Sequence, residues 1–126
     1  ANTVVLSFKL TVGRVVITNE QMTTNEAIAH FNLYDDKLRG YIYAYLKNYD
    51  YKKLGSTSSI AIAVNSKIIK SMPIALPSEN DLDKFNKSTN SIFEKIRNNE
   101  IENNRLEEIK NILLPKLMDG EVDLKK

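Results

Sequence analysis

A long heptad pattern constrains this chain more than any other feature of its sequence. From Leu82 to about Leu114, one set of positions recurs at alternating steps of four and three residues. The set is Phe85, Thr89, Ile92, Ile96, Asn99, Asn103, Leu106, Lys110 and Leu113, with a drift to Ile109 near its end. Such a seam of about four heptads predicts an α-helix of roughly 45–50 Å that packs against a partner helix.

The rest of the chain is too short to cover this helix. We expect residues 1–77 to form a compact domain, and residues 78–126 to form the long dimerisation helix with a short C-terminal tail. The partner helix must then come from a second chain or from another half of the same protein. Pro115 is expected to kink or end the helix, and Gly120 to stop it before the tail EVDLKK.

Four asparagines interrupt the apolar pattern within RNNEIENNRL, at residues 97–106. Asparagine is a mediocre helix former because its amide competes for nearby backbone groups. Asn99 and Asn103 fall on the seam, which leaves two interpretations. Either these are solvated positions on a surface helix, or they lie within a helix pair and penalise every register that leaves their amides facing apolar side chains.

The first part of the chain combines strand and helix patterns, which predicts an α+β fold. β-Branched residues alternate on both sides of Gly13 between residues 4 and 18, and AIAHFNL predicts a further strand. Apolar residues spaced three and four apart predict an amphipathic helix over residues 36–50, whose tyrosines we expect to pack against a sheet. An extended strand ending in PIALP should follow, and then the cap of the long helix, which is Ser78, Asn80 or Asp81. We therefore expect a small mixed or antiparallel β domain with packed helices, followed by one long coiled-coil-forming helix.

Composition excludes several classes of protein. The chain contains no cysteine, no apolar run near the roughly 18–20 residues of a membrane span, and no secretory signal pattern at its N-terminus. We therefore expect a cytoplasmic protein without disulfides or membrane partners. The net charge is only +2, but nine basic residues stand against five acidic residues within residues 1–77. This excess permits nucleic acid as a partner without requiring it.

The sequence offers little for catalysis. Its single histidine, His30, lies within AIAHF and is expected to be a hydrogen-bonded, partly buried strand residue. Asp35 and Asp36 precede the predicted tyrosine-rich helix and are interpreted as its cap. No zinc-binding, P-loop or dinucleotide-binding motif occurs in the sequence. We predict that the chain is not an enzyme and has no catalytic residues, metal or cofactor.

The clearest candidate binding site is the loop LGSTSS, which follows Lys52 and Lys53 directly. Main-chain amides and the hydroxyls of Ser56, Thr57 and Ser58 are able to hydrogen-bond phosphates beside these lysines. A plain solvated turn is the alternative interpretation, and these residues alone do not decide between the two.

Four segments, in the same order, resemble the specificity subunit of type I restriction–modification enzymes. LSFKLTVGRVVIT, TTNEAIAHF and GSTSSIAIAVNSKIIKSMPIALP are similar to the late part of a target recognition domain. The helix that closes with NNRLEEIKNILLPKLMDGEV resembles the conserved carboxyl-terminal region of that subunit. Because recognition domains of the family are longer than the first part of this chain, we expect the chain to begin partway through one.

This resemblance implies a non-catalytic subunit that binds double-stranded DNA. In the family, each recognition domain reads half of a split target, while antiparallel conserved helices fix the separation of the halves and dock methyltransferase subunits. The implied DNA-facing residues are Lys52, Lys53, Ser56, Thr57 and Ser58, with Lys9 and Arg14 behind them. The seam residues of the heptad pattern are expected to make the helix contacts, in a homodimer or with another half of the subunit: Phe85, Ile92, Ile96, Asn99, Asn103, Leu106, Ile109 and Leu113. A coiled-coil assembly module that binds no DNA is the alternative function.

Overall fold

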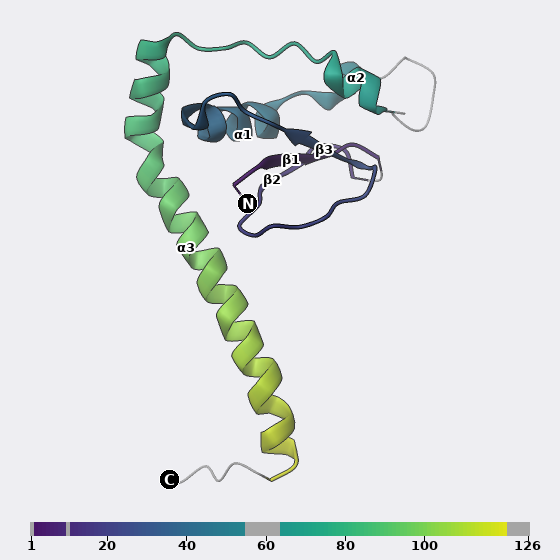
Figure 1. Cartoon of the computed structure of the whole chain (residues 1–126), viewed down its shortest axis with the longest axis vertical. Helices are drawn as coiled ribbons and strands as arrows, with labels where there is room; N and C mark the ends of the chain where they lie inside the picture. The colour runs from purple at the N-terminus through teal and green to yellow at the C-terminus, as the bar shows by residue number, and fades with distance from the viewer. Residues whose placement is uncertain (1, 10, 55–63, 121–126) are drawn as a thin grey trace. The chain divides into compact units, whose positions relative to one another are not determined.

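A computed structural model describes residues 2–9, 11–54 and 64–120 of the chain (Figure 1). The chain divides into two compact units, Ala1–Asn90 and Ser91–Lys126. The first unit contains a small sheet, short helices and the first turns of a long helix, and the second contains the rest of that helix. The predicted α+β class is confirmed.

The sheet has β1 (Val4–Ser7) in the middle, between β2 (Arg14–Ile17) and β3 (Ile28–Phe31). Both pairs are antiparallel, and Leu6 of β1 lies opposite Val15 on one side and Ala29 on the other. Residues that lie opposite each other on neighbouring strands point to the same face of a sheet, so these three side chains lie on one face, and this face packs against the core. As predicted, β1 and β2 lie within the β-branched segment around Gly13, and β3 lies within AIAHFNL.

The predicted turn between the first two strands forms around Gly13. This residue has a φ of +89°, in the region that favours glycine, and its N–H donates to the Ser7 carbonyl at 3.1 Å. A Cβ atom at this position would lie 2.9 Å from Cδ2 of Tyr51. Both the backbone conformation and the close approach of the tyrosine ring therefore require glycine here.

The predicted helix over residues 36–50 forms as a 3-10 turn, η1 (Asp36–Leu38), followed by α1 (Arg39–Asn48). Asp35 caps the turn as expected, because its Oδ1 accepts a hydrogen bond from the Lys37 N–H at 2.9 Å. The residues that α1 and the preceding turn bury in the core recur every four positions: Leu38, Ile42 and Leu46. The contact with the sheet is thus chiefly aliphatic, and the tyrosines of α1 are only partly buried around it.

The strand predicted before the long helix does not form in the described residues. The sequence after Asn65 instead starts a short helix, α2 (Ser66–Lys70), and a run without regular secondary structure then leads to the long helix (Figure 1). This run contains Pro73 and Pro77, which have no N–H to donate to a neighbouring strand. Two of its carbonyls accept hydrogen bonds from tyrosine side chains instead.

The long helix, α3 (Glu79–Met118), contains 40 residues, and both its existence and its cap were predicted correctly. Ser78 Oγ accepts a hydrogen bond from the Asp81 N–H at 3.2 Å and donates to the Asp81 carboxylate at 2.7 Å. Pro115 does not end the helix at once: α3 continues for three more residues to Met118, although proline has no N–H to donate to the carbonyl four residues earlier. Gly120, with a φ of +73°, follows the helix end as expected.

The length of α3 does not make it a membrane segment. Charged and amide side chains recur along it, and none of the helices in the described part of the chain is both long enough and apolar enough to cross a bilayer.

We expect Gly13→Ala to destabilise the first unit by about 1–3 kcal/mol, because alanine is strained at this φ and its Cβ would collide with the Tyr51 ring. Urea denaturation followed by circular dichroism measures the change. Gly120→Ala is the matched control, since Gly120 also has a positive φ but open space around its Cβ position. Equal losses in both variants would show that the collision with Tyr51 contributes nothing.

Candidate nucleic-acid interface

Tyr51 holds the segment that carries the two predicted DNA-binding lysines. It begins a 3-10 turn, η2 (Tyr51–Leu54), and its hydroxyl donates to the Leu46 carbonyl near the end of α1 at 2.7 Å. Its ring meets that of Tyr49 edge-on, with 5.3 Å between the centroids. Burial raises the pKa of Tyr51 to about 12, and the neighbouring Tyr49 adds to the shift. The turn is thereby fixed to α1 at its first residue.

The contact between Tyr51 and Gly13 brings two distant parts of the sequence together. The turn after β1 lies against the ring of Tyr51, so Gly13, which precedes Arg14, contacts the side chain of the residue that precedes Lys52. Arg14, Lys52 and Lys53 are all exposed. Three of the predicted DNA-facing residues therefore come from adjacent segments that one aromatic contact holds in place.

Asp50 shapes the turn and partly balances its charge. Its Oδ1 accepts from the Lys52 N–H at 3.2 Å, and its Oδ2 lies 3.7 Å from Lys53 Nζ. An exposed ion pair at this distance contributes at most about 1 kcal/mol, because water screens it. Lys53 is therefore available to a phosphate at little energetic cost.

Lys9 forms a closer ion pair than Lys53 does. Its Nζ lies 2.5 Å from Glu26 Oε1, and the hydrogen bond and charge of Lys9 lower the pKa of the Glu26 carboxyl. The Glu26 carboxylate offsets the charge of Lys9 toward a phosphate, although the ammonium group keeps two further N–H donors. Lys9 is thus paired more closely with a carboxylate than Lys53, and its DNA-facing role stays a prediction.

The predicted phosphate-binding loop itself cannot be compared with the prediction. Ser56, Thr57 and Ser58 belong to residues 55–63, which lie outside the described residues. Their proposed role follows only from their chemistry and from the position of Lys52 and Lys53 just before them.

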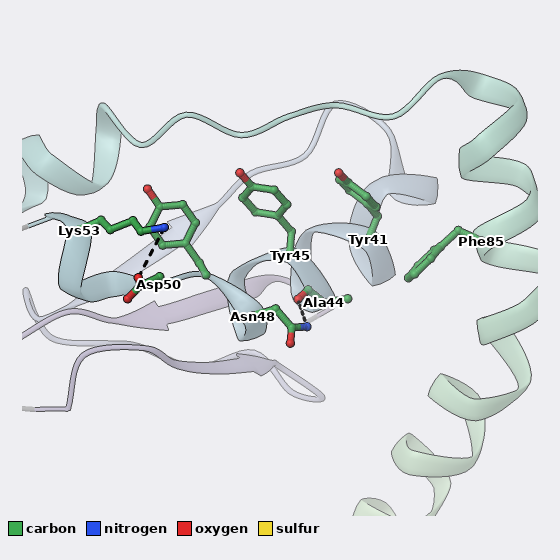
Figure 2. A pocket seen from close by; sticks show the side chains of 8 residues that line it. Tyr41, Ala44, Tyr45, Asn48, Asp50, Lys53 and Phe85 are labelled. Carbon is green, nitrogen blue, oxygen red and sulfur yellow. Dashed lines mark hydrogen bonds and ion pairs between the residues drawn. The ribbon is translucent and has the colours of Figure 1, made fainter.

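An open groove of about 500 Å³ lies along α1, and Figure 2 shows its lining. Tyr41, Tyr45 and Tyr49 follow one another along the helix, with 6.1 and 6.0 Å between successive ring centroids. Phe85 approaches from the beginning of α3 and meets the ring of Tyr41 edge-on at 5.9 Å. These tyrosines line the groove instead of packing chiefly against the sheet as expected, and their four-residue spacing is the sequence signal for this separate face of the helix.

The hydroxyls on this face bind backbone. The Tyr41 hydroxyl donates to the Ala75 carbonyl at 2.7 Å, and the Tyr45 hydroxyl donates to the Pro73 carbonyl at 3.0 Å. Both acceptors belong to the run between α2 and α3, and both rings point toward it in Figure 2. These bonds are not predictable from the sequence, because a main-chain carbonyl acceptor leaves no signature in the identity of the side chain.

The described residues form no group of His, Asp and Glu side chains suited to a metal ion. His30 accordingly stands apart from any such cluster, and its Nε2 lies 2.6 Å from Thr24 Oγ1. It is exposed, whereas the sequence predicted a partly buried residue. The reason is that β3 is an edge strand, and alternation directs this position away from the core face that Ala29 shares.

The helix seam is open to solvent in the second unit. Its apolar residues are between 43% and 57% exposed: Ile92, Ile96, Leu106, Ile109 and Leu113. Asn99 and Asn103 are exposed as well. Phe85 differs, because it lies in the first unit and packs on Tyr41.

Comparison with known proteins shows the family. A model of the type I restriction modification DNA specificity domain matches residues 1–111, so the chain belongs to this family. The chain is also 33% identical, over 126 residues, to the type I restriction enzyme HindI specificity subunit of Haemophilus influenzae. The alignment covers 97% of this chain but only 28% of that relative. No solved structure matches the chain.

These findings confirm the resemblance that the sequence motifs indicated. The family is one of DNA specificity domains, in agreement with the prediction that the chain is not an enzyme. The segments that carried the resemblance contain the end of β1, all of β2, β3 and α2, and the later part of α3, and residues 10, 55–63 and 121–122 of these segments lie outside the described residues.

Tyr51 is expected to make stability depend on pH in the alkaline range. Its pKa of about 12 in the folded chain exceeds the ordinary value of 10. The contribution of the protonated Tyr51 hydroxyl to the free energy of unfolding is therefore complete below pH 10. It is lost as the pH rises through 12, because the hydroxyl releases its proton at a lower pH in the unfolded chain than in the folded chain. Urea denaturation should show the stability difference between wild type and Tyr51→Phe shrinking over this interval. Tyr34→Phe, at an 83% exposed position, is the control. A difference that stays constant with pH would contradict the expectation.

Proposed function

We propose that this chain is a DNA-reading part of a type I restriction–modification specificity subunit. The first unit binds half of a split duplex target, and the long helix sets the separation of two halves and docks methyltransferase subunits. The observation that carries the proposal is the match to a DNA specificity domain over residues 1–111. The exposed basic residues and the exposed helix seam supply its physical support.

The DNA-facing surface is proposed to lie around η2 and the turn after β1. Arg14, Lys52 and Lys53 are exposed on adjacent segments, and Tyr51 fixes those segments to one another. Lysine ammonium groups position a duplex through its phosphates, and arginine binds phosphate or the edge of guanine with paired donors. Ser56, Thr57 and Ser58 would add hydroxyl donors directly after the lysines.

The helix is proposed to pair with a second copy or with another half of a specificity subunit. Its exposed seam is apolar enough to require cover, and burial of that seam would supply the driving force. Asn99 and Asn103 would then select one register of the pair, because any other register leaves their amides facing apolar side chains. A fixed register suits a helix that fixes a distance.

The end of α3 supports docking of a further partner. Ile109, Leu113 and Leu117 form one exposed row, and Leu114 and Met118 form a second row about 100° around the helix. A helix that is apolar on more than one side is covered from more than one side. One row would face the paired helix, and the other would face a methyltransferase subunit.

The exposed seam also favours a second function, a coiled-coil assembly module without DNA binding. The helix alone does not distinguish the two functions. DNA binding does, because only the first function requires salt-dependent affinity that depends on the residues around η2.

We expect Lys52→Ala with Lys53→Ala to weaken binding to duplexes of random sequence, and to flatten the slope of log affinity against log salt by about one unit for each lost phosphate contact. Fluorescence anisotropy over a series of salt concentrations measures both. Lys84→Ala with Lys87→Ala, at exposed positions on α3, removes the same charge elsewhere. Equal effects of the two double variants would overturn the proposed surface, and absence of duplex binding by wild type would favour the assembly module.

We expect the chain to be a homodimer through the exposed seam and Ile96→Asp to dissociate it, because the change would bury an unpaired charge in the helix pair. Sedimentation equilibrium measures the dissociation constant, which should rise by at least about tenfold, the equivalent of about 1.4 kcal/mol. Asn98→Asp introduces the same group two residues further on, about 200° around the helix, and should leave the dimer intact. A monomeric wild-type chain would refute the pairing.

A further inference from the structure

We call residues 72–78, which lie between Ser71, the C-cap of α2, and the start of α3, the strap. It is bound to α1 by two hydroxyl hydrogen bonds, from Tyr41 to the Ala75 carbonyl at 2.7 Å and from Tyr45 to the Pro73 carbonyl at 3.0 Å. Figure 2 shows both rings pointing from α1 toward this segment. The strap leads directly into the cap of α3, so these bonds lie at the connection between the sheet-bearing part of the first unit and the long helix.

The spacing of the donors matches the spacing of the acceptors. Four residues of α-helix rise about 6 Å, and two residues of extended chain span about 6–7 Å. Successive carbonyls of an extended chain point in different directions, so a shift of the strap by one residue would break both bonds. Pro73 and Pro77 restrict the backbone on either side of Ala75, which lowers the freedom of the strap further. The two tyrosines therefore define one register of the strap.

The same tyrosine face also contacts the beginning of α3. The ring of Tyr41 meets Phe85 edge-on at 5.9 Å, within the first unit. Asn86 Nδ2 donates to the Lys37 carbonyl at 3.0 Å, and Leu82 is buried in the core of that unit. The strap and the first turns of α3 are thus held by one face of α1 and by the turn that precedes it.

We propose that Tyr41 and Tyr45 are positioning residues that fix the start of α3 on the recognition unit, and so determine which separation of two half-sites a paired assembly accepts. This inference rests on the proposed function for its consequence in DNA binding. The reason is mechanical. A helix pair can hold two half-sites at a set number of base pairs, about 3.4 Å each, only if each helix begins at a set place on its own recognition unit.

The first test measures the junction without DNA. The chain has no cysteine, so Val16→Cys on β2 and Lys87→Cys on α3 give two specific attachment sites for spin labels. Both native residues are exposed and both belong to the first unit. Pulsed electron paramagnetic resonance should give a narrow distance distribution in wild type and a broader one in Tyr41→Phe with Tyr45→Phe, which keeps both rings and removes both hydroxyls. Tyr34→Phe, at an exposed position, should leave the distribution narrow.

The second test measures the consequence for DNA binding. A half-site selected from random duplexes is placed in two inverted copies, with spacers that differ by one base pair at a time, because a two-fold dimer reads an inverted repeat. Wild type should prefer one spacer. We measure this preference as the ratio of the affinities for the preferred spacer and for a spacer one base pair longer. In the double tyrosine variant this ratio should fall about fivefold for each hydrogen bond that is removed, while the affinity for a single half-site stays unchanged. A merely structural loss would lower the affinity for the half-site as well.

The outcomes separate this inference from the proposed function. A broader distance distribution between the spin labels, together with a weaker spacer preference, in the double tyrosine variant supports the inference. A distance distribution that stays as narrow in the double tyrosine variant as in wild type overturns the inference, whatever the DNA measurement gives. A broader distribution with an unchanged spacer preference overturns it as well. Failure of wild type to bind any duplex overturns the proposed function and the spacer role together, and the label measurement then still decides whether the tyrosines fix the junction.

Discussion

The rest of the structure depends on the two-sided packing of α1. One side of the helix buries Ile42 and Leu46 in the core with the sheet, and a neighbouring side presents tyrosine hydroxyls to the strap. The end of the helix is used as well, since the Leu46 carbonyl accepts the Tyr51 hydroxyl at 2.7 Å. A ten-residue helix therefore orients the basic turn, the strap and the start of α3. The basic turn, which follows α1 closely, and the start of α3, which begins some thirty residues later, thus share one support.

The sequence predicted those elements whose pattern is repeated over many residues. The heptad seam identified α3 because a period sustained over about four heptads is typical of a long helix and of no strand or loop. The strands on both sides of Gly13 were visible for the same reason, and the glycine itself marked the turn. Ser78 was recognisable as a cap because its hydroxyl is able to replace the missing acceptor of a first-turn amide.

Features that depend on tertiary contacts were not predictable. The strap resembled a strand in sequence, but its prolines prevent it from pairing with the sheet, and tyrosine hydroxyls provide its bonds instead. The contact between Gly13 and Tyr51 joins residues that share no local pattern, so the packing of the turn after β1 on the first residue of η2 could not be predicted from the sequence alone. His30 was expected to be partly buried because its neighbours are apolar, and only the edge position of β3 accounts for its exposure.

The two bonds from α1 to the strap have a consequence for how this protein can vary. Tyr41 and Tyr45 recognise main-chain carbonyls, which every amino acid carries, and they make no demand on the side chains of the residues that supply them. Substitutions at Ala75 or at the exposed Leu76 can therefore accumulate without disturbing the connection. Changes in the number of residues are different, because one inserted residue moves the next carbonyl by about 3.3 Å and removes it from its donor. The composition of this segment is thus free to drift, while its length is constrained.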